Sequence, residues 1–227
     1  RRIREALEPP VRARLRLLRR DGERIEMLRQ PLALARLVAM DLETTGPHMH
    51  RDRVICIGAV GVRARTIRHD DCFERYLRQE QASPVNNILL HQIGGQQQLG
   101  GVEPATALLE CLEFLGNSAA VAFRAEFDRT ILDREMAAVL GVRLRNPFID
   151  LAVLLPALFP NTDNVTLEDW LRQFNFRTPA RHHALSDAYC HGALLLPVLE
   201  RAMRAGLSTV GDLKGIEKAQ RWLGRIR

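Results

Sequence analysis

The chain has 227 residues, is 46% hydrophobic and carries a formal net charge of +6, values ordinary for a globular protein with one sizeable core. No apolar run approaches the length of a membrane span and the start shows no secretory signal pattern, so we expect a cytoplasmic protein without a membrane partner. The four cysteines lie far apart and form no Cys-x-x-Cys pair, which argues against a zinc site and a disulfide framework. The positive charge, almost all arginine, suits a phosphate-rich partner, although a solvated arginine-rich surface would give the same count.

Residues 1–35 differ in pattern from the rest of the chain. Apolar residues recur there at helical spacing among many arginines: Ile3, Leu7, Val11, Leu15 and Leu18. Pro9-Pro10 must interrupt any single helix, Asp21-Gly22 predicts a turn, and a second short helix is expected over 23–30. We expect a basic helical extension that braces the main domain or docks a partner, because its apolar face needs covering. A basic arm for nucleic acid is the alternative.

From Arg36 onward the pattern alternates between strands and helices. The expected strands are 37–43, 54–62, 72–77, 119–123 and 148–151. The expected helices are 104–115, 127–140, an apolar stretch ending at Phe159-Pro160, 167–174 with Thr166 as N-cap, 184–205 and 209–222. The polar segment 79–101 is expected to be a loop with room for one short helix. This order predicts an α/β fold with a mixed sheet flanked by helices, a main domain over 36–205, and a C-terminal helix within 206–227 packed on it.

The stretch Val38-Ala39-Met40-Asp41-Leu42-Glu43 delivers two carboxylates at the end of an apolar run. Side chains alternate on a strand, so Asp41 and Glu43 project to one side while Leu42 points to the other. Two like charges at the end of a buried strand are costly without a compensating cation. A hard divalent ion, which prefers oxygen ligands, would supply this compensating charge. An acidic strand end that faces water would not need such an ion.

Two later stretches add carboxylates at junctions between secondary structure elements. Asp128 follows the predicted strand 119–123 where a helix begins, a place where α/β proteins hold their sites, although the helix dipole alone also favours an acidic residue there. Asp187 stands at the front of the long helix, five residues after His182. A histidine beside a carboxylate at such a junction can exchange a proton near neutral pH.

Taken together, three motifs resemble the signature of the DEDDh 3′→5′ exonucleases, the group of the proofreading epsilon subunit of bacterial DNA polymerase III, ribonuclease T and oligoribonuclease. The motifs are Asp41-x-Glu43-Thr44-Thr45-Gly46, Phe127-Asp128 and His182-x4-Asp187-Ala188. Further segments agree with the family pattern: His91-Gln92-Ile93, Asp150-Leu151-Ala152 and Thr166-Leu167-Glu168-Asp169-Trp170-Leu171. Two positions depart from it, because Gly94 stands where the family often has Thr and Arg124 where Asn is common.

The resemblance implies a ribonuclease H-like, mixed five-stranded sheet in which four carboxylates hold two divalent ions, Mg²⁺ or Mn²⁺. These residues are Asp41, Glu43, Asp128 and Asp187. His182 would be the general base, since its spacing to Asp187 fits the family, and His183 would then face solvent or contact a phosphate. Thr44, Thr45 and the His91 loop would seat the terminal nucleotide, and Arg124 would contact a phosphate or point to solvent. Asp150 is expected either to orient a neighbouring residue or to end a strand.

The resemblance therefore implies a metal-dependent phosphodiester hydrolase that degrades single-stranded DNA or DNA 3′ ends. An exoribonuclease of the same fold is the alternative, because the motifs are common to both. A non-catalytic nucleic-acid or polymerase-binding module would be expected to lack a carboxylate or the histidine, and all five residues are present. As a partner we expect a DNA polymerase or another replication protein, held by the N-terminal extension or by the final helix.

Overall fold

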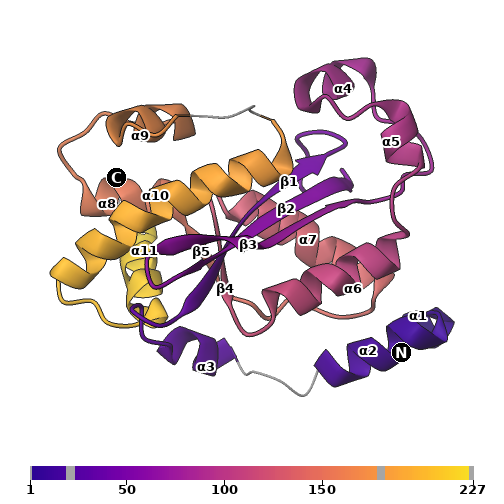
Figure 1. Cartoon of the computed structure of the whole chain (residues 1–227), viewed down its shortest axis with the longest axis horizontal. Helices are drawn as coiled ribbons and strands as arrows, with labels where there is room; N and C mark the ends of the chain where they lie inside the picture. Colours follow the sequence, from indigo (N-terminus) through magenta and orange to yellow (C-terminus); the bar gives the residue numbers. More distant parts are fainter. Residues whose placement is uncertain (1, 19–23, 178–181, 225–227) are drawn as a thin grey trace.

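The computed structural model describes residues 2–18, 24–177 and 182–224, and its centre is a five-stranded sheet in the order β3-β2-β1-β4-β5 (Figure 1). The strands are β1 (Arg36–Thr44), β2 (Val54–Arg63), β3 (Thr66–Tyr76), β4 (Ala119–Ala122) and β5 (Phe148–Asp150). β1, β2 and β3 pair antiparallel, while β1, β4 and β5 pair parallel. The predicted mixed α/β sheet is confirmed.

The helices follow the predicted order with small shifts at their ends. They are α1 (Arg2–Ala6), α2 (Pro9–Leu18), α3 (Arg24–Arg29), α4 (Val85–His91), α5 (Gly95–Leu99), α6 (Pro104–Leu115), α7 (Glu126–Val139), α8 (Leu151–Leu158), α9 (Leu167–Gln173), α10 (Ala184–Arg204) and α11 (Val210–Gly224). Among the described residues, no helix is both long and apolar enough to cross a membrane.

Two predictions need correction. The third strand begins at Thr66, six residues before the predicted start, because it continues as a hairpin with β2 as far as Arg63. The polar segment 79–101 holds two short helices, α4 and α5, where one at most was expected. Gln98 organises this segment from a buried position: its side chain accepts a hydrogen bond from the backbone N–H of Ser83 and donates one to the carbonyl of Ile93.

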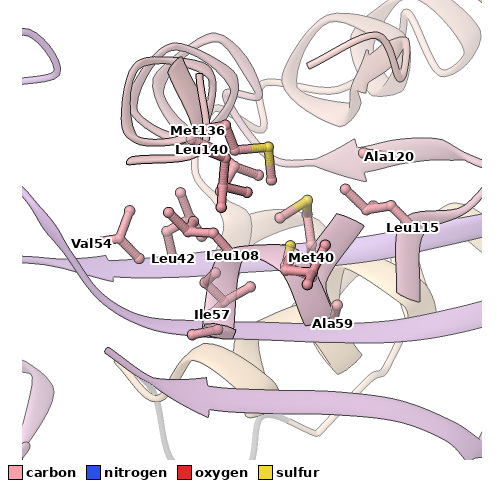
Figure 2. Packing of buried hydrophobic residues seen from close by; sticks show 14 of the residues in the cluster. Met40, Leu42, Val54, Ile57, Ala59, Leu108, Leu115, Ala120, Met136 and Leu140 are labelled. Carbon is pink, nitrogen blue, oxygen red and sulfur yellow. The ribbon is translucent and has the colours of Figure 1, made fainter. Parts of the chain in front are cut away.

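Two large hydrophobic cores and one small cluster surround the sheet in the described residues, and β1 contributes to both large cores. Val38, Met40 and Leu42 belong to the core that β1 and β2 form with α6 and α7 (Figure 2). Leu37 and Ala39 belong to the other core, built with α8, α9, α10 and α11. Because side chains alternate along a strand, Asp41 and Glu43 lie on the face covered by α10.

The described part of the N-terminal segment packs on α6. Leu7, Val11 and Leu15 are buried in the core shared with α6. The guanidinium of Arg14 forms an ion pair with the Glu113 carboxylate of α6. The helical conformation is interrupted between α1 and α2. Pro9 begins the second helix, where its missing N–H costs no hydrogen bond. The predicted turn at Asp21-Gly22 lies outside the described residues.

The C-terminal helix α11 also packs on the domain, against α8, α3 and β5. Val210 and Leu213 are fully buried in the core beneath it. The ammonium of Lys214 donates a 2.6 Å hydrogen bond to the carbonyl of Phe148 in β5. This places α11 beside β5, the strand that ends at Asp150.

Candidate active site

Three of the predicted carboxylates meet at one place. Each of Asp41, Glu43 and Asp187 offers a carboxylate oxygen, and these three oxygens all lie within 4.8 Å of one another. Asp41 and Glu43 come from β1, whereas Asp187 comes from the first turn of α10. Glu43 and Asp187 are buried, with 9% and 5% of their surface exposed. A cluster of this density needs positive charge for compensation, and its all-oxygen donor set suits Mg²⁺ or Mn²⁺.

A glycine in the neighbouring strand allows α10 to bring Asp187 to this cluster. Gly58 of β2 is the register partner of Asp41, and the backbone of Ala184 packs directly against it. Further along α10, His191 is buried and its Nδ1 lies 2.8 Å from the carbonyl oxygen of Met40. Since a carbonyl only accepts, Nδ1 carries the proton and donates. These two contacts fix α10 on β2 before Asp187 and on β1 after it.

Asp128 stands apart from the three-carboxylate group, although it is close to it. β4 pairs only with residues 37–39 of β1, which leaves the end of β1 open on that side. The Asp128 carboxylate enters there from the first turn of α7 and accepts a hydrogen bond from the Leu42 backbone. Burial raises the pKa of Asp128 to about 8, and the nearby negative charges of Asp150 and Glu43 add to this increase. In the absence of a cation this carboxyl therefore tends to hold its proton.

His182 and His183 have different surroundings. His182 is exposed, has a left-handed backbone conformation (φ 58°), and donates its backbone N–H to the Asp187 carboxylate at 3.2 Å. His183 is half-buried, with its Nδ1 3.6 Å from a carboxylate oxygen of Glu74 on β3. At this distance neither atom has a hydrogen-bond partner among the described residues, and 42% of the His183 side chain is exposed, so the side chain is partly open to solvent, one of the two alternatives expected for it. His182 is the more exposed of the two histidines.

Hydrogen bonds connect the predicted nucleotide-seating residues to the end of β1 and to the neighbouring loops. The Thr44 hydroxyl donates to the carbonyl of Gly46, and the Thr45 hydroxyl accepts from the backbone N–H of Arg53. The side-chain amide of Asn87 on α4 donates to the carbonyl of Thr44 at 2.7 Å and lies 3.1 Å from Nε2 of His91. His91 is 2% exposed, and this burial lowers its pKa. The structure therefore places α4 beside the carboxylate cluster, with the His91 ring inside the loop.

Arg124 lies in the turn between β4 and α7, four residues before Asp128. Its side chain is exposed and its backbone is left-handed (φ 60°), a conformation that Asn adopts more readily than Arg. The Arg124 N–H donates a 3.0 Å hydrogen bond to Asp150, whose carboxylate also caps α8 through Ala152. Asp150 thus fulfils both expected roles, because it ends β5 and holds the turn that leads to Asp128.

Four residues around the site were not predicted: Gly58, Glu74, Asn87 and His191. Their contacts to α10 or to β1 join residues that are distant in sequence. Gly58 interrupts an apolar strand, which is a signal for close backbone approach. The other three carry no local pattern that would have marked them.

Comparisons with known proteins agree with this geometry. The family described as exonuclease (RNase_T) matches residues 38–195. The DNA polymerase III subunit epsilon of Aquifex aeolicus is 26% identical over 197 residues, covering 85% of this chain and 95% of the relative. The PolC-type DNA polymerase III of Bacillus subtilis is 28% identical over 177 residues, covering 78% of this chain but only 12% of the relative. The chain thus spans nearly the whole of one relative and about an eighth of the other.

Solved structures show the same fold. Exonuclease I of E. coli, in complex with a dT13 oligonucleotide, superposes with a TM-score of 0.64 at 17% identity, over 75% of this chain and 42% of that chain. Exonuclease X, in complex with 5′ overhanging duplex DNA, gives a TM-score of 0.61 at 19% identity, over 78% of this chain and 98% of that chain. The predicted ribonuclease H-like fold and the predicted enzyme class are both confirmed. Because the family match covers most of the chain, this chain belongs to the exonuclease family.

Proposed function

We propose that this protein is a metal-dependent 3′→5′ exonuclease that removes nucleotides from DNA ends. The observation that carries the proposal is the convergence of Asp41, Glu43 and Asp187 within 4.8 Å, from two elements far apart in sequence. Structural carboxylates gain from being spread apart or paired with cations, whereas this cluster concentrates negative charge at a strand end. Such a concentration is the donor set that divalent-cation chemistry requires.

In this proposal, Asp41, Glu43, Asp128 and Asp187 hold two divalent ions, Mg²⁺ or Mn²⁺. Bound there, the ions would supply charge to activate water, to neutralise the phosphate and to stabilise the leaving oxygen. Hydrolysis joins the water oxygen to phosphorus and breaks the bond from phosphorus to the 3′ oxygen of the preceding nucleotide. A nucleoside 5′-monophosphate leaves, and the strand keeps a free 3′ hydroxyl.

The chain's own residues then have separate tasks. The imidazole of His182 accepts the proton that the attacking water loses, since it is exposed and its backbone is held by the Asp187 carboxylate at 3.2 Å. Thr44, Thr45 and the loop around His91 form the seat of the terminal nucleotide, with α4 fixed to β1 through Asn87. The exposed side chain of Arg124 approaches a phosphate of the bound strand.

DNA is the proposed substrate because the superposed exonucleases were solved with a dT13 oligonucleotide and with overhanging duplex DNA. RNA is the alternative, since the cluster and the histidine do not distinguish the sugars. Digestion of 5′-labelled single-stranded DNA and RNA of matched sequence, with Mg²⁺, with Mn²⁺ and with chelator, tests both. A metal-dependent ladder that shortens from the 3′ end supports the proposal, and the faster substrate identifies the sugar. No cleavage of either strand by folded protein would favour a binding module.

A replicative DNA polymerase is the proposed protein partner, because the relatives are components of DNA polymerase III. A cytoplasmic location would follow from that partner.

We further propose an exonuclease domain over 36–205, braced by 1–35 and by the helix within 206–227. Leu17 on α2 and Trp222 on α11 are 67% and 64% exposed, which offers apolar contact area on both flanking segments. Sedimentation of the purified chain with its own organism's polymerase tests the partner: co-sedimentation that Leu17→Ser or Trp222→Ser weakens supports it, and independent sedimentation contradicts it.

A further inference from the structure

Asp150, at the end of β5, connects the turn before Asp128 to the C-terminal helix. It is 4% exposed, so its charge needs partners within the protein. One carboxylate oxygen accepts from the backbone N–H groups of Arg124 and Ala152, both at 3.0 Å. The other oxygen accepts from the guanidinium of Arg221 on α11 at 2.8 Å. The carboxylate is therefore held between a backbone turn and a cation from the far end of the chain.

The turn that Asp150 holds determines where α7 begins. Arg124 is left-handed there, and this conformation costs an arginine free energy that the surroundings must offset. Its N–H is bound by Asp150, and its carbonyl accepts a 3.1 Å hydrogen bond from the N–H of Phe127. Asp128 is the next residue, so the turn sets the position of its carboxylate at the end of β1.

Arg221 also contacts α7 directly. Its second terminal nitrogen donates to the Glu126 carboxylate at 3.1 Å, in the first turn of that helix. The guanidinium therefore bridges the end of β5 and the start of α7, the two elements on either side of the turn. Its planar, two-armed shape suits this task better than a single ammonium would. About half of the Arg221 side chain is covered, at 42% exposure, while Asp150 beneath it is enclosed.

We propose that Arg221 is a positioning residue for the candidate metal site, acting through Asp150 and the Arg124 turn on Asp128. The inference rests on the proposed function, since it assumes that Asp128 holds a divalent ion. It assigns α11 a role beyond packing: the C-terminal helix completes the support of the fourth carboxylate. Without the guanidinium, the buried Asp150 charge loses its cation, and the turn and the first turn of α7 lose a common anchor.

The test of this inference is the Mn²⁺ affinity of the protein in the absence of substrate. Binding is measured as the loss of the paramagnetic resonance signal of free Mn²⁺. Arg221→Gln is the test variant, and Arg204→Gln is the matched control, because Arg204 also pairs with a carboxylate, Glu200, on the surface of α10. Each variant is measured at a temperature at which circular dichroism shows it to be fully folded. Loss of a residue that orients a metal ligand typically weakens metal binding by about 10- to 100-fold. We expect Arg221→Gln to fall in that range, with Arg204→Gln close to wild type.

Two further variants separate positioning from general destabilisation. Arg221→Lys keeps the charge but loses the planar fork that reaches both carboxylates, so it should recover part of the lost Mn²⁺ affinity. In an Asp150→Asn background, adding Arg221→Gln should change the affinity little, because the connection is already broken. If Arg221→Gln does not fold, Asp150→Asn takes its place: weaker Mn²⁺ binding by this folded variant supports the route through Asp150, and wild-type affinity overturns it.

The outcomes are distinct. Wild-type affinity in Arg221→Gln, or equal losses in Arg221→Gln and Arg204→Gln, overturns the positioning role and leaves the metal site standing. Full additivity of Arg221→Gln with Asp150→Asn overturns the route through Asp150. Absence of Mn²⁺ binding in the wild-type protein overturns the proposed function, and the positioning role with it.

Discussion

Gly58 and Ala184 are in direct backbone contact: a Cβ placed on Gly58 would lie 2.1 Å from the carbonyl carbon of Ala184. Gly58 is also the register partner of Asp41. The start of α10 therefore rests on the strand beside the carboxylate cluster, which brings Asp187 to Asp41. Any side chain at this position would separate the two halves of the proposed site.

Gly58→Ala is accordingly expected to destabilise the protein and to weaken divalent-ion binding. Overpacking of this kind typically costs about 1–3 kcal/mol. Gly215→Ala is the control, since no atom lies within 4 Å of a Cβ there and alanine is the better helix former. Denaturant unfolding and Mn²⁺ titration of both variants provide the check. Equal stability and equal Mn²⁺ affinity in Gly58→Ala and wild type would show that α10 shifts without cost.

Asp41→Ala is expected to abolish exonuclease turnover while leaving the metal-free fold intact. Removing one carboxylate relieves repulsion with Glu43 and Asp187, so the metal-free melting temperature should be unchanged or higher. Mn²⁺ should raise the melting temperature of the wild type by mass action and that of the variant much less. Asp70→Ala is the control, because Asp70 is an exposed carboxylate on β3. Near-full activity of Asp41→Ala would rule out the proposed site.

The two adjacent histidines are expected to respond differently to substitution. General-base catalysis typically contributes about 10²- to 10⁴-fold to the rate, so His182→Ala should lower kcat by that amount. His183→Ala should cause a much smaller loss of kcat, because the Nδ1 of His183 faces the Glu74 carboxylate on β3 and not the carboxylate cluster. Single-turnover rates and melting temperatures of both variants test the assignment. The reverse order of the kcat losses would make His183 the base.

The stability of the metal-free protein is expected to fall with rising pH because of Asp128. Burial raises its pKa in the folded protein to about 8, whereas a solvated aspartate has a pKa of about 3.9. Between these two values the folded protein binds a proton that the unfolded chain has released. The free energy of unfolding therefore decreases as pH rises across that window.

Urea unfolding in chelator, between about pH 5 and pH 8, measures this slope. Asp128→Asn should reduce it by at most about 1.4 kcal/mol per pH unit, the value for one proton. Other titrating groups are present in both proteins, so the difference between the two curves isolates Asp128. Parallel curves would show that Asp128 is ionised in the folded, metal-free protein.

Much of the framework could be predicted from local sequence. The apolar run before Asp41 predicted β1, and the period of two placed Asp41 and Glu43 on one face, because alternation is a property of the strand itself. The family resemblance singled out Asp128, His182 and Asp187 as candidates, each at a junction between a loop or strand and a helix. The start of β3 was missed, because polar residues at a sheet edge carry no clear period.

The tertiary structure alone decided which groups meet. Residues 41–43 and 187 converge because Gly58 admits α10, and Arg221 reaches Asp150 because α11 folds back on β5 and α8. It also decided that His183 lies near Glu74 and that Asp128 lies beside the cluster rather than within it. Local periodicity reports only the face on which a residue lies. Contacts between distant segments depend on packing and on the partners available to each buried charge, and these exist only once the chain has folded.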